Sequence, residues 1–539
     1  MVIQLARMAL RASAEQPQLE AFVISPYPEP CYAVSMESNP LIAGLDVGTT
    51  NVKALIAEPN GHVLATASVP TPTNHPQPGW AHYEPEDIWS SACQALRQAT
   101  SKVPEPDRIA GIAVASIGET AFPVNQAGQT TFPGIAWYDT RARTQCDWLV
   151  EHIGAERIYA TCRMSIQPIY GLCKMLWLRD NEPRAFSDAV CWLNTADYVA
   201  FRLSGEKATD PSLASRALLF DVDRFAWARS LLEDCGLSPE LLAPLHRSGT
   251  AIGTVLPDVA EATGIPSSAQ VSTGGHDHVV GALGVGVTEP GTVLNSLGTA
   301  EALFLPILSP LNRPEMAQKG YSVGGHVAWD RFYAIGGLYS SGGSVNWVKS
   351  LLGDLNHRTL LESASNVEPG SLGVLFLPHL RIANPPFGDA PSRGAFVGLS
   401  GDVDKGILYR AVLEGIAMEA KLCLGGLLDY AELENPDRII AIGGSTRNDL
   451  LMQIKASVYD RAITVSSVEE GTALGAALLG GLGAGVYSDL EDISTTVERR
   501  TRTIESDPGL VSRYAELFET YAQVYPSLKE LNSQIDANR

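Results

Sequence analysis

The chain has 539 residues, 45% of them hydrophobic and 18% charged, which is the composition of an ordinary globular protein. Because a single hydrophobic core stops growing at about 250–300 residues, we expect more than one domain. The net charge of −21, from 60 acidic and 39 basic residues, argues against nucleic acid and anionic membranes as partners, since a free acidic surface repels both.

Neither a membrane span nor a disulfide framework is expected. No apolar run reaches the ~18 residues that a spanning helix needs. None of the eight cysteines belongs to a Cys-X-X-Cys pair, and most lie in apolar surroundings, which predicts reduced core residues in a cytoplasmic protein. Residues 1–40 predict a flexible N-terminal tail; Arg7 and Arg11 in an apolar context leave a targeting segment as the alternative.

A glycine-containing turn joins two apolar runs at Leu41–Ala57, a pattern that predicts a β-hairpin. Gly48 has no Cβ, so the backbone there can approach a ligand closely. Thr49 and Thr50 add hydroxyl and amide groups, and Lys53 adds a positive charge. These are groups that can bind the phosphates of a nucleotide, although an ordinary hairpin turn fits the residues equally well.

Asp46 lies at the end of the first of these two strands. Mg²⁺ in proteins usually keeps several waters and takes one or two carboxylates. Asp46 is therefore a candidate metal ligand, with a surface aspartate as the alternative.

Two later segments carry groups typical of sugar sites. A Pro-rich loop at residues 71–84, after a predicted strand, contains Gln77, Trp80 and His82, which could contact a sugar or simply pack the loop. After a helix from Pro85 and a buried strand at Ile109–Ser116, a further strand end presents an aromatic ring and two charged groups, Trp137, Asp139 and Arg141. A polyol suits that combination; the alternative is an Asp139–Arg141 surface pair of little energetic value.

A strand that ends in two glycines and continues into a helix occupies Val271–Gly284, after a mainly helical region at residues 145–250. Asp277 falls at the start of the helix, where the helix dipole favours the ionised carboxylate. Such a group can accept a proton from a hydroxyl, although helix caps are common. A metal site at His276 and His278 lacks a third ligand nearby.

The segment Gly291–Phe304 repeats the outline of the first hairpin, with Gly298 and Thr299 in the turn. A duplicated fold with one phosphate-binding hairpin on each side of a cleft follows from this repeat. Farther on, the pattern predicts a long helix capped by Asp404, a buried strand at Arg438–Gly444, a small-residue helix at Glu470–Gly485 and one final helix at Val511–Leu531.

The order of these motifs resembles the FGGY carbohydrate kinases of the actin/hexokinase/Hsp70 ATPase superfamily. The resemblance runs from residue 41 to about 525. It rests on DVGTTNVKA at 46–54, WYDTRA at 137–142, GGHDHVVGALG at 274–284, LGTAE at 297–301, LEGIAME at 413–419, IGGSTRNDLLMQ at 442–453 and GTALGAALL at 471–479.

The resemblance implies an α/β fold of two ribonuclease-H-like domains with Mg-ATP in the cleft between them. The N-terminal domain would cover residues 41–287 and the C-terminal domain 288–525, followed by a tail at 526–539. By the same resemblance Asp46 belongs to the Mg²⁺ site and Asp277 is the base. Phosphate and nucleotide contacts would come from Gly48, Thr49, Thr50, Lys53, Gly298, Thr299, Gly443, Gly444 and Asn448, and sugar contacts from Gln77, Trp80, His82, Trp137 and Asp139.

The sequence also departs from the family pattern. The segment Ala115–Thr120 lacks the usual Gln-containing run, and the loop at 74–84 lacks the Arg-Glu pair of glycerol kinases. We therefore expect a kinase that acts on a ketose such as a pentulose or deoxyhexulose, or on a polyol. A non-catalytic sensor and a nucleotide hydrolase are the alternatives, and the sequence leaves a homodimer open.

Overall fold

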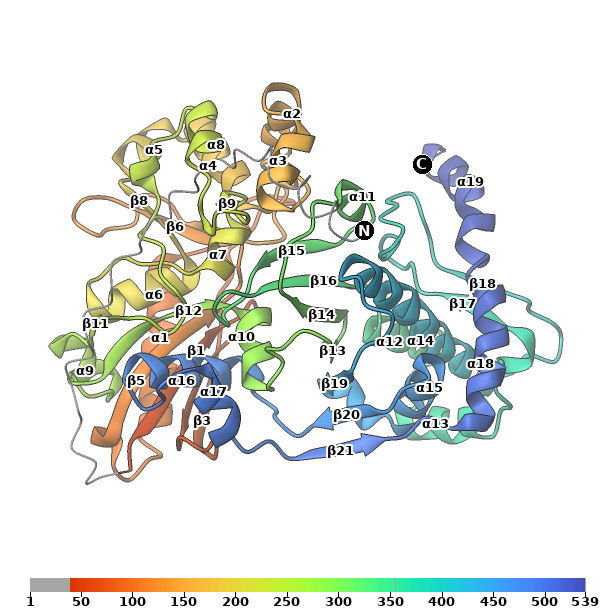
Figure 1. Ribbon diagram of the computed structural model, residues 1–539. Coiled ribbons are helices and arrows are strands. Elements are labelled where there is room, and N and C mark those ends of the chain that lie inside the picture. The colour runs from red at the N-terminus through yellow and green to blue at the C-terminus, as the bar shows by residue number, and fades with distance from the viewer. Residues whose placement is uncertain (1–38, 354, 539) are drawn as a thin grey trace, which may run out of the picture. The chain divides into compact units, whose positions relative to one another are not determined.

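The computed structural model describes residues 39–353 and 355–538, so the predicted N-terminal tail lies almost entirely outside the described residues. Two mixed β-sheets form the centres of two α/β domains (Figure 1). The first sheet has the order β11-β12-β5-β1-β2-β3. Its strands are β1 (Leu41–Val47), β2 (Asn51–Ala57), β3 (Val63–Pro70), β5 (Ile109–Ser116), β11 (Ala251–Thr254) and β12 (Gln270–His276).

The second sheet repeats this arrangement, with the order β15-β16-β14-β13-β19-β20-β21. In each sheet a central strand pairs antiparallel with the next strand of a hairpin and parallel with a strand that comes much later, β1 with β2 and β5, β13 with β14 and β19. The strands are β13 (Thr292–Leu297), β14 (Glu301–Ile307), β15 (Ser322–Gly325), β16 (Phe332–Leu338), β19 (Arg438–Ile442), β20 (Ile463–Ser466) and β21 (Thr501–Ile504). The predicted duplication of the hairpin is confirmed.

Helices cover the faces of the first sheet and build a cap beside it (Figure 1). Helix α1 (Pro85–Thr100) packs on β2 and β3, and α9 (Pro257–Thr263) packs on α1. The predicted helical region contains α2 (Arg143–His152), α3 (Ala155–Cys162), α4 (Gly171–Asn181), α5 (Pro183–Asp188), α6 (Thr195–Ser204), α7 (Pro211–Arg216) and α8 (Arg229–Asp234). The short strands of this part of the chain are β4 (His82–Tyr83), β6 (Ala121–Val124), β7 (Gly134–Ile135), β8 (Cys191–Asn194), β9 (Phe220–Asp221) and β10 (Ala226–Trp227).

Two small-residue helices, α10 (Asp277–Gly284) and α16 (Gly471–Gly483), pack against each other and share a hydrophobic core with residues of both sheets. Helix α16 comes late in the chain but lies directly on β1. A Cβ at Gly44 of β1 would be 2.0 Å from the Ala473 carbonyl oxygen, so only glycine permits this approach. The contact brings the start of α16 beside the first hairpin.

The second domain carries most of the remaining helices, with the short β17 (Leu375–Leu377) and β18 (Ala395–Val397). These helices are α11 (Pro314–Gln318), α12 (Gly342–Leu351), α13 (His357–Ser365), α14 (Lys405–Tyr430), α15 (Asp449–Tyr459), α18 (Pro508–Tyr521) and α19 (Val524–Ala537). Helix α17 (Leu490–Thr496) lies instead beside the first sheet (Figure 1), where Ile493 packs with residues of β1 and β2. As predicted, the Asp404 side chain caps α14, accepting from the Ile407 amide at 2.9 Å. No helix within the described ranges is long and apolar enough to cross a bilayer.

The prediction of one final helix at Val511–Leu531 is wrong. The chain leaves α18 at Tyr521 and starts α19 at Val524, and residues 526–537, which we expected in a tail, belong to α19. Pro526 explains the break, because proline has no N–H and is tolerated in the first turn of a helix but not in its interior.

Candidate active site

In both hairpins a glycine amide donates a hydrogen bond that closes the turn. The Gly48 amide donates to the Asn51 carbonyl at 3.1 Å, and the Gly298 amide donates to the Ala300 carbonyl at 2.9 Å. The second turn is further held by the first residues of α12, because the Gly343 amide donates to the Thr299 carbonyl at 2.9 Å. Each turn therefore presents a fixed loop at the end of its sheet.

Two cavities meet at the second hairpin. The first, which we call the helical cavity, has a volume of about 490 Å³ and is lined by Gly298, Thr299 and the beginnings of α12, α13 and α15. The second, which we call the acidic cavity, has a volume of about 500 Å³ and is lined by Thr49, Asp277 and Gly298 among others. Gly298 belongs to both walls, so the two cavities adjoin at this turn.

Groups suited to a nucleotide surround the helical cavity. Helix N-termini present free backbone N–H groups and a favourable dipole to anions. Gly444 and Asn448, both predicted from the sequence, line this cavity. Gly443 lies just behind it with a φ of +98°, and a Cβ there would be 2.4 Å from the Leu297 carbonyl oxygen. Further lining residues that the sequence did not single out are Asn346, His357 and Arg447.

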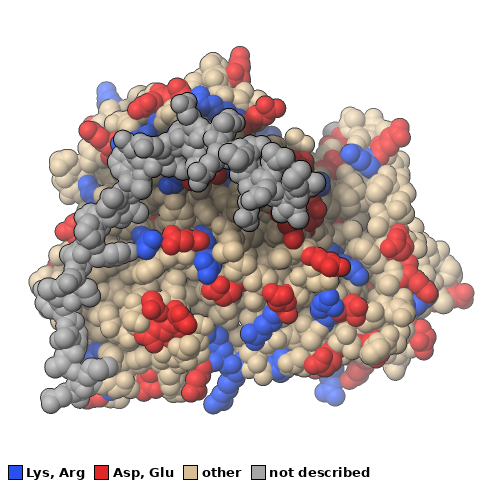
Figure 2. Space-filling model, viewed as in Figure 1, with Lys and Arg blue, Asp and Glu red and all other residues tan. Residues whose placement is uncertain are grey.

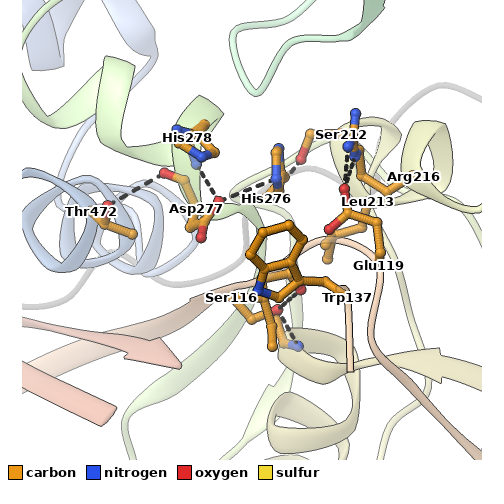
Figure 3. Close-up of polar contacts among 12 residues, drawn as sticks. Ser116, Glu119, Trp137, Ser212, Leu213, Arg216, His276, Asp277, His278 and Thr472 are labelled. Atoms are coloured by element: carbon orange, nitrogen blue, oxygen red, sulfur yellow. Dashed lines mark hydrogen bonds and ion pairs between the residues drawn. The ribbon is translucent and has the colours of Figure 1, made fainter. Parts of the chain in front are cut away.

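Asp277 is the first residue of α10, and about a quarter of its side chain is exposed to the acidic cavity. Its Oδ1 accepts from the His278 amide at 2.6 Å and lies 3.1 Å from His276 Nε2 (Figure 3). Burial lowers the pKa of His276 to about 3, so this ring is neutral and can donate from Nε2. Both contacts orient the carboxylate, and Oδ2 has no hydrogen-bond donor among the described residues, so it is available to a ligand.

Asp46, near the end of β1, is partly buried and lines neither the helical nor the acidic cavity. Burial and the neighbouring Asp277 carboxylate raise the pKa of Asp46 to about 8. Its cross-strand partner Lys53 does not line the helical or the acidic cavity, because its Nζ binds Glu470, the residue before α16, at 2.6 Å. The predicted contact of Lys53 with phosphate is therefore not supported by its position, and Glu470 is a charged neighbour that the sequence did not reveal.

The residues in this region fit a Mg²⁺ ion held by a single protein carboxylate. In the part of the chain that the structure describes, no group of three or more His, Cys, Asp and Glu side chains could hold a metal alone. The raised pKa of Asp46 means that its ionised carboxylate is unfavourable unless a cation lies nearby. A carboxylate of this kind suits an ion whose other ligands are phosphate oxygens and water.

The aromatic residue predicted on the sugar side is in the acidic cavity. Trp137 is 40% exposed, lines the cavity and donates from Nε1 to Thr49 Oγ1 at 3.0 Å, which ties it to the first hairpin. Thr50 is exposed in the same turn but lines neither cavity.

The structure does not bring Gln77, Trp80, His82 or Asp139 to the acidic cavity. Asp139 is 1% exposed, and its carboxylate accepts from the Ala81 amide at 2.7 Å and from Arg141 at 2.6 Å. The Arg141 guanidinium in turn lies 3.9 Å from the centre of the Trp80 ring. These contacts hold the loop at residues 71–84 against the strand end, and the ion pair is buried rather than on the surface.

Glu119 and Arg216 line the acidic cavity as well, and the sequence analysis did not select them as site residues. The two lie 97 positions apart and form an ion pair (Figure 3). In the sequence, the only sign that Glu119 could belong to the site was that its segment, Ala115–Thr120, departs from the family pattern.

Two α/β domains with matching hairpins, and cavities that meet between them, define a phosphotransferase of the actin-like class. The model of the FGGY family of carbohydrate kinases matches with its N-terminal domain at residues 41–284 and its C-terminal domain at 293–484. The chain therefore belongs to the FGGY family of carbohydrate kinases. It is a sugar kinase, which implies ATP as the co-substrate and a small-molecule sugar as the acceptor.

Relatives of known name agree with this assignment. The chain is 29% identical over 502 residues to the xylulose kinase of Bacillus subtilis (strain 168), covering 92% of this chain and 99% of that protein. It is 28% identical over 520 residues to an autoinducer-2 kinase of Escherichia coli, covering 91% and 94%. The crystal structure of the xylulose kinase from Rhodospirillum rubrum has a TM-score of 0.84 at 26% identity, covering 92% and 100%.

Proposed function

We propose that the enzyme transfers the γ-phosphoryl group of Mg-ATP to a hydroxyl of a ketose, such as a pentulose or deoxyhexulose, or of a polyol. The observation that supports this most strongly is the meeting of the two cavities at Gly298, with Asp277 in the wall of the acidic cavity. ATP would occupy the helical cavity and the acceptor the acidic cavity. The relatives named xylulose kinase favour a ketose as acceptor.

Asp277 acts as the general base. As the acceptor oxygen forms its bond to the γ-phosphorus, the bond from that phosphorus to the β-γ bridging oxygen breaks and ADP leaves. The proton of the attacking hydroxyl passes to Asp277, whose other oxygen is held by the His278 amide. Phosphoryl transfer needs positioning and charge neutralisation more than covalent chemistry, which this arrangement can supply.

The two hairpins bind the phosphates. Thr49 on one side, and Gly298 and Thr299 on the other, offer amide and hydroxyl donors to the transferred group. Asp46 would hold the Mg²⁺ ion, which neutralises phosphate charge when bound. Trp137 would pack against the carbon skeleton of the acceptor.

A screen for ADP release over ketoses, aldoses, polyols and sugar acids tests the reaction. We expect at least one ketose or polyol to raise turnover well above the ATPase background, and a panel without any effect would refute the proposal. Asp277→Asn should keep ATP binding but lower kcat by about 10²–10⁴-fold, because a positioned base contributes that much.

A matched control is Asp258→Asn, which changes another first-turn aspartate that lines neither cavity. It should leave kcat near the wild-type value. If Asp277→Asn is as active as this control, Asp277 is not the base.

A further inference from the structure

We propose that Trp137 is a positioning residue that couples the two substrates, because its indole N–H orients the Thr49 hydroxyl toward the transferred phosphoryl group. This inference rests on the proposed function, which places the phosphates at the two turns and the acceptor against Trp137. It adds an energetic link, through which the acceptor and ATP each bind more tightly when the other is present.

The backbone of the first turn is held on both sides of Thr49. Thr71, the residue after β3, is buried, and its Oγ1 donates to the Gly48 carbonyl at 2.9 Å. Its amide donates to the Thr50 carbonyl, also at 2.9 Å. The backbone of the turn is therefore fixed, and the rotation of the Thr49 side chain remains to be set by another group.

The indole of Trp137 sets this rotation. Its Nε1 lies 3.0 Å from Thr49 Oγ1, and both residues line the acidic cavity. A threonine hydroxyl has one hydrogen to donate and two lone pairs, whereas an indole N–H can only donate. The indole therefore occupies a lone pair and leaves the hydroxyl hydrogen for a different acceptor. In the proposed function that acceptor is an oxygen of the γ-phosphoryl group.

The segment that carries Trp137 is anchored on both sides of the indole. Before it, the Ala136 amide donates to the Ala81 carbonyl at 2.9 Å, and the Ala136 carbonyl accepts from Lys174 Nζ at 3.1 Å. After it, Asp139 is buried, and its amide donates to the Ala136 carbonyl at 3.1 Å. A side chain on such a rigid support can hold its partner in one geometry, as a functional site requires.

The exposure of Trp137 makes the hydrogen bond sensitive to the acceptor. Because 40% of the residue is exposed, water competes for the indole N–H and for the Thr49 hydroxyl. An acceptor that packs against the ring excludes this water and restricts the ring, so the hydroxyl is oriented before ATP binds. One hydrogen bond of this kind changes an affinity by about 2–10-fold. Coupling between two binding sites is reciprocal, so ATP strengthens acceptor binding by the same factor.

The alternative is that the hydrogen bond only joins two loops. Calorimetric titration with adenylyl imidodiphosphate, an ATP analogue whose γ-phosphoryl group is not transferred, separates the two possibilities. The titration is run without a second compound and then with each ketose or polyol of the ADP-release panel at saturation. In the wild type we expect at least one compound to tighten analogue binding by about 2–10-fold or more.

Trp137→Phe keeps an aromatic ring but has no N–H, and this gain in affinity should fall by about 2–10-fold. An equal gain in the two proteins would overturn the inference. Trp329→Phe is the matched control, since its indole N–H donates to the Ser248 carbonyl at 2.9 Å and Trp329 lines neither cavity. This control should keep the wild-type gain.

Variants of Thr49 test whether the effect passes through its hydroxyl. Thr49→Ser keeps the hydroxyl and should keep the gain, whereas Thr49→Val keeps the shape without the hydroxyl and should lose it. In the Thr49→Val background, Trp137→Phe should have no further effect on the gain, because the two residues act through one bond. A full effect of Trp137→Phe in that background would overturn the role of Thr49.

Because the titration needs no turnover, the inference and the proposed function fail separately. A gain in the wild type that Trp137→Phe lowers, without phosphorylation of any compound, would refute the kinase reaction alone. Turnover by the wild type with equal gains in the wild type and Trp137→Phe would refute the coupling alone. A wild-type chain for which no compound alters the affinity for the analogue, and none is phosphorylated, would refute both.

Discussion

The two hairpins have the same backbone pairing but carry different side chains at matching positions. In the first, Asp46 lies opposite Lys53 across the strands, and in the second the same register positions hold Ser296 and Ala302. The second turn is one residue shorter, because Leu297 pairs with Glu301 whereas Val47 pairs with Val52. Only the first hairpin therefore has a carboxylate at this register position.

The acidic residue of the second hairpin points into the protein interior. Glu301 has a fully buried side chain and accepts from Lys455 Nζ at 2.6 Å, from Asn295 at 2.8 Å and from Ser341 at 2.8 Å. In a strand, a shift of one residue moves a side chain to the opposite face. The position of an acidic residue in the strand register thus decides whether its side chain can contact a ligand or instead binds interior groups that hold the turn. Figure 2 shows that acidic and basic side chains are interspersed on the viewed surface.

The largest expected effect concerns the two lysine–acid pairs. Lys455→Met leaves Glu301 buried without its cation and should lower the free energy of unfolding by about 3–5 kcal/mol. Lys53→Met breaks a pair whose side chains are about one-third exposed, 34% and 33%. This substitution should change the free energy of unfolding by less than about 1 kcal/mol. Urea denaturation of both variants checks this, and similar losses would contradict the distinction between an interior and a solvent-screened pair.

The elements that sequence reasoning predicted well depend on local signals. The strands, the two turns and Asp277 at a helix start follow from apolar periodicity and neighbouring glycines. Glu119, in the segment after β5, meets Arg216 of α7 only through tertiary packing, which no local pattern encodes. Trp80 and Asp139 were expected at the sugar for their chemistry, but their partner Arg141 holds them in the loop instead.

A smaller effect concerns two buried histidines, one from each domain. Burial lowers the pKa of both His276 and His326 to about 3. The unfolded chain takes up these protons below about pH 6.5 but the folded chain does not, so stability falls on acidification, by up to about 1.4 kcal/mol per pH unit for each group. His326 Nδ1 accepts from the Ala328 amide at 2.7 Å, and His326→Asn keeps an acceptor there without titrating.

His326→Asn should therefore have a stability that falls less steeply between pH 6 and pH 5 than the wild type, by up to about 1.4 kcal/mol over that unit. Urea midpoints at pH 7, 6 and 5 measure this. The same slope in both proteins would mean that His326 becomes protonated without unfolding.

The smallest expected effect tests the register argument at the ligand. Asp46→Ala removes the carboxylate of the first hairpin, and the Mg²⁺ concentration for half-maximal activity should rise by about tenfold or more, since supporting groups of metal sites contribute about 10–100-fold to affinity. Ser296→Ala changes the corresponding position of the second hairpin and should leave this Mg²⁺ dependence unaltered. Equal Mg²⁺ dependence in the two variants would mean that the two hairpins contribute alike to the metal, and that the register difference carries no functional consequence.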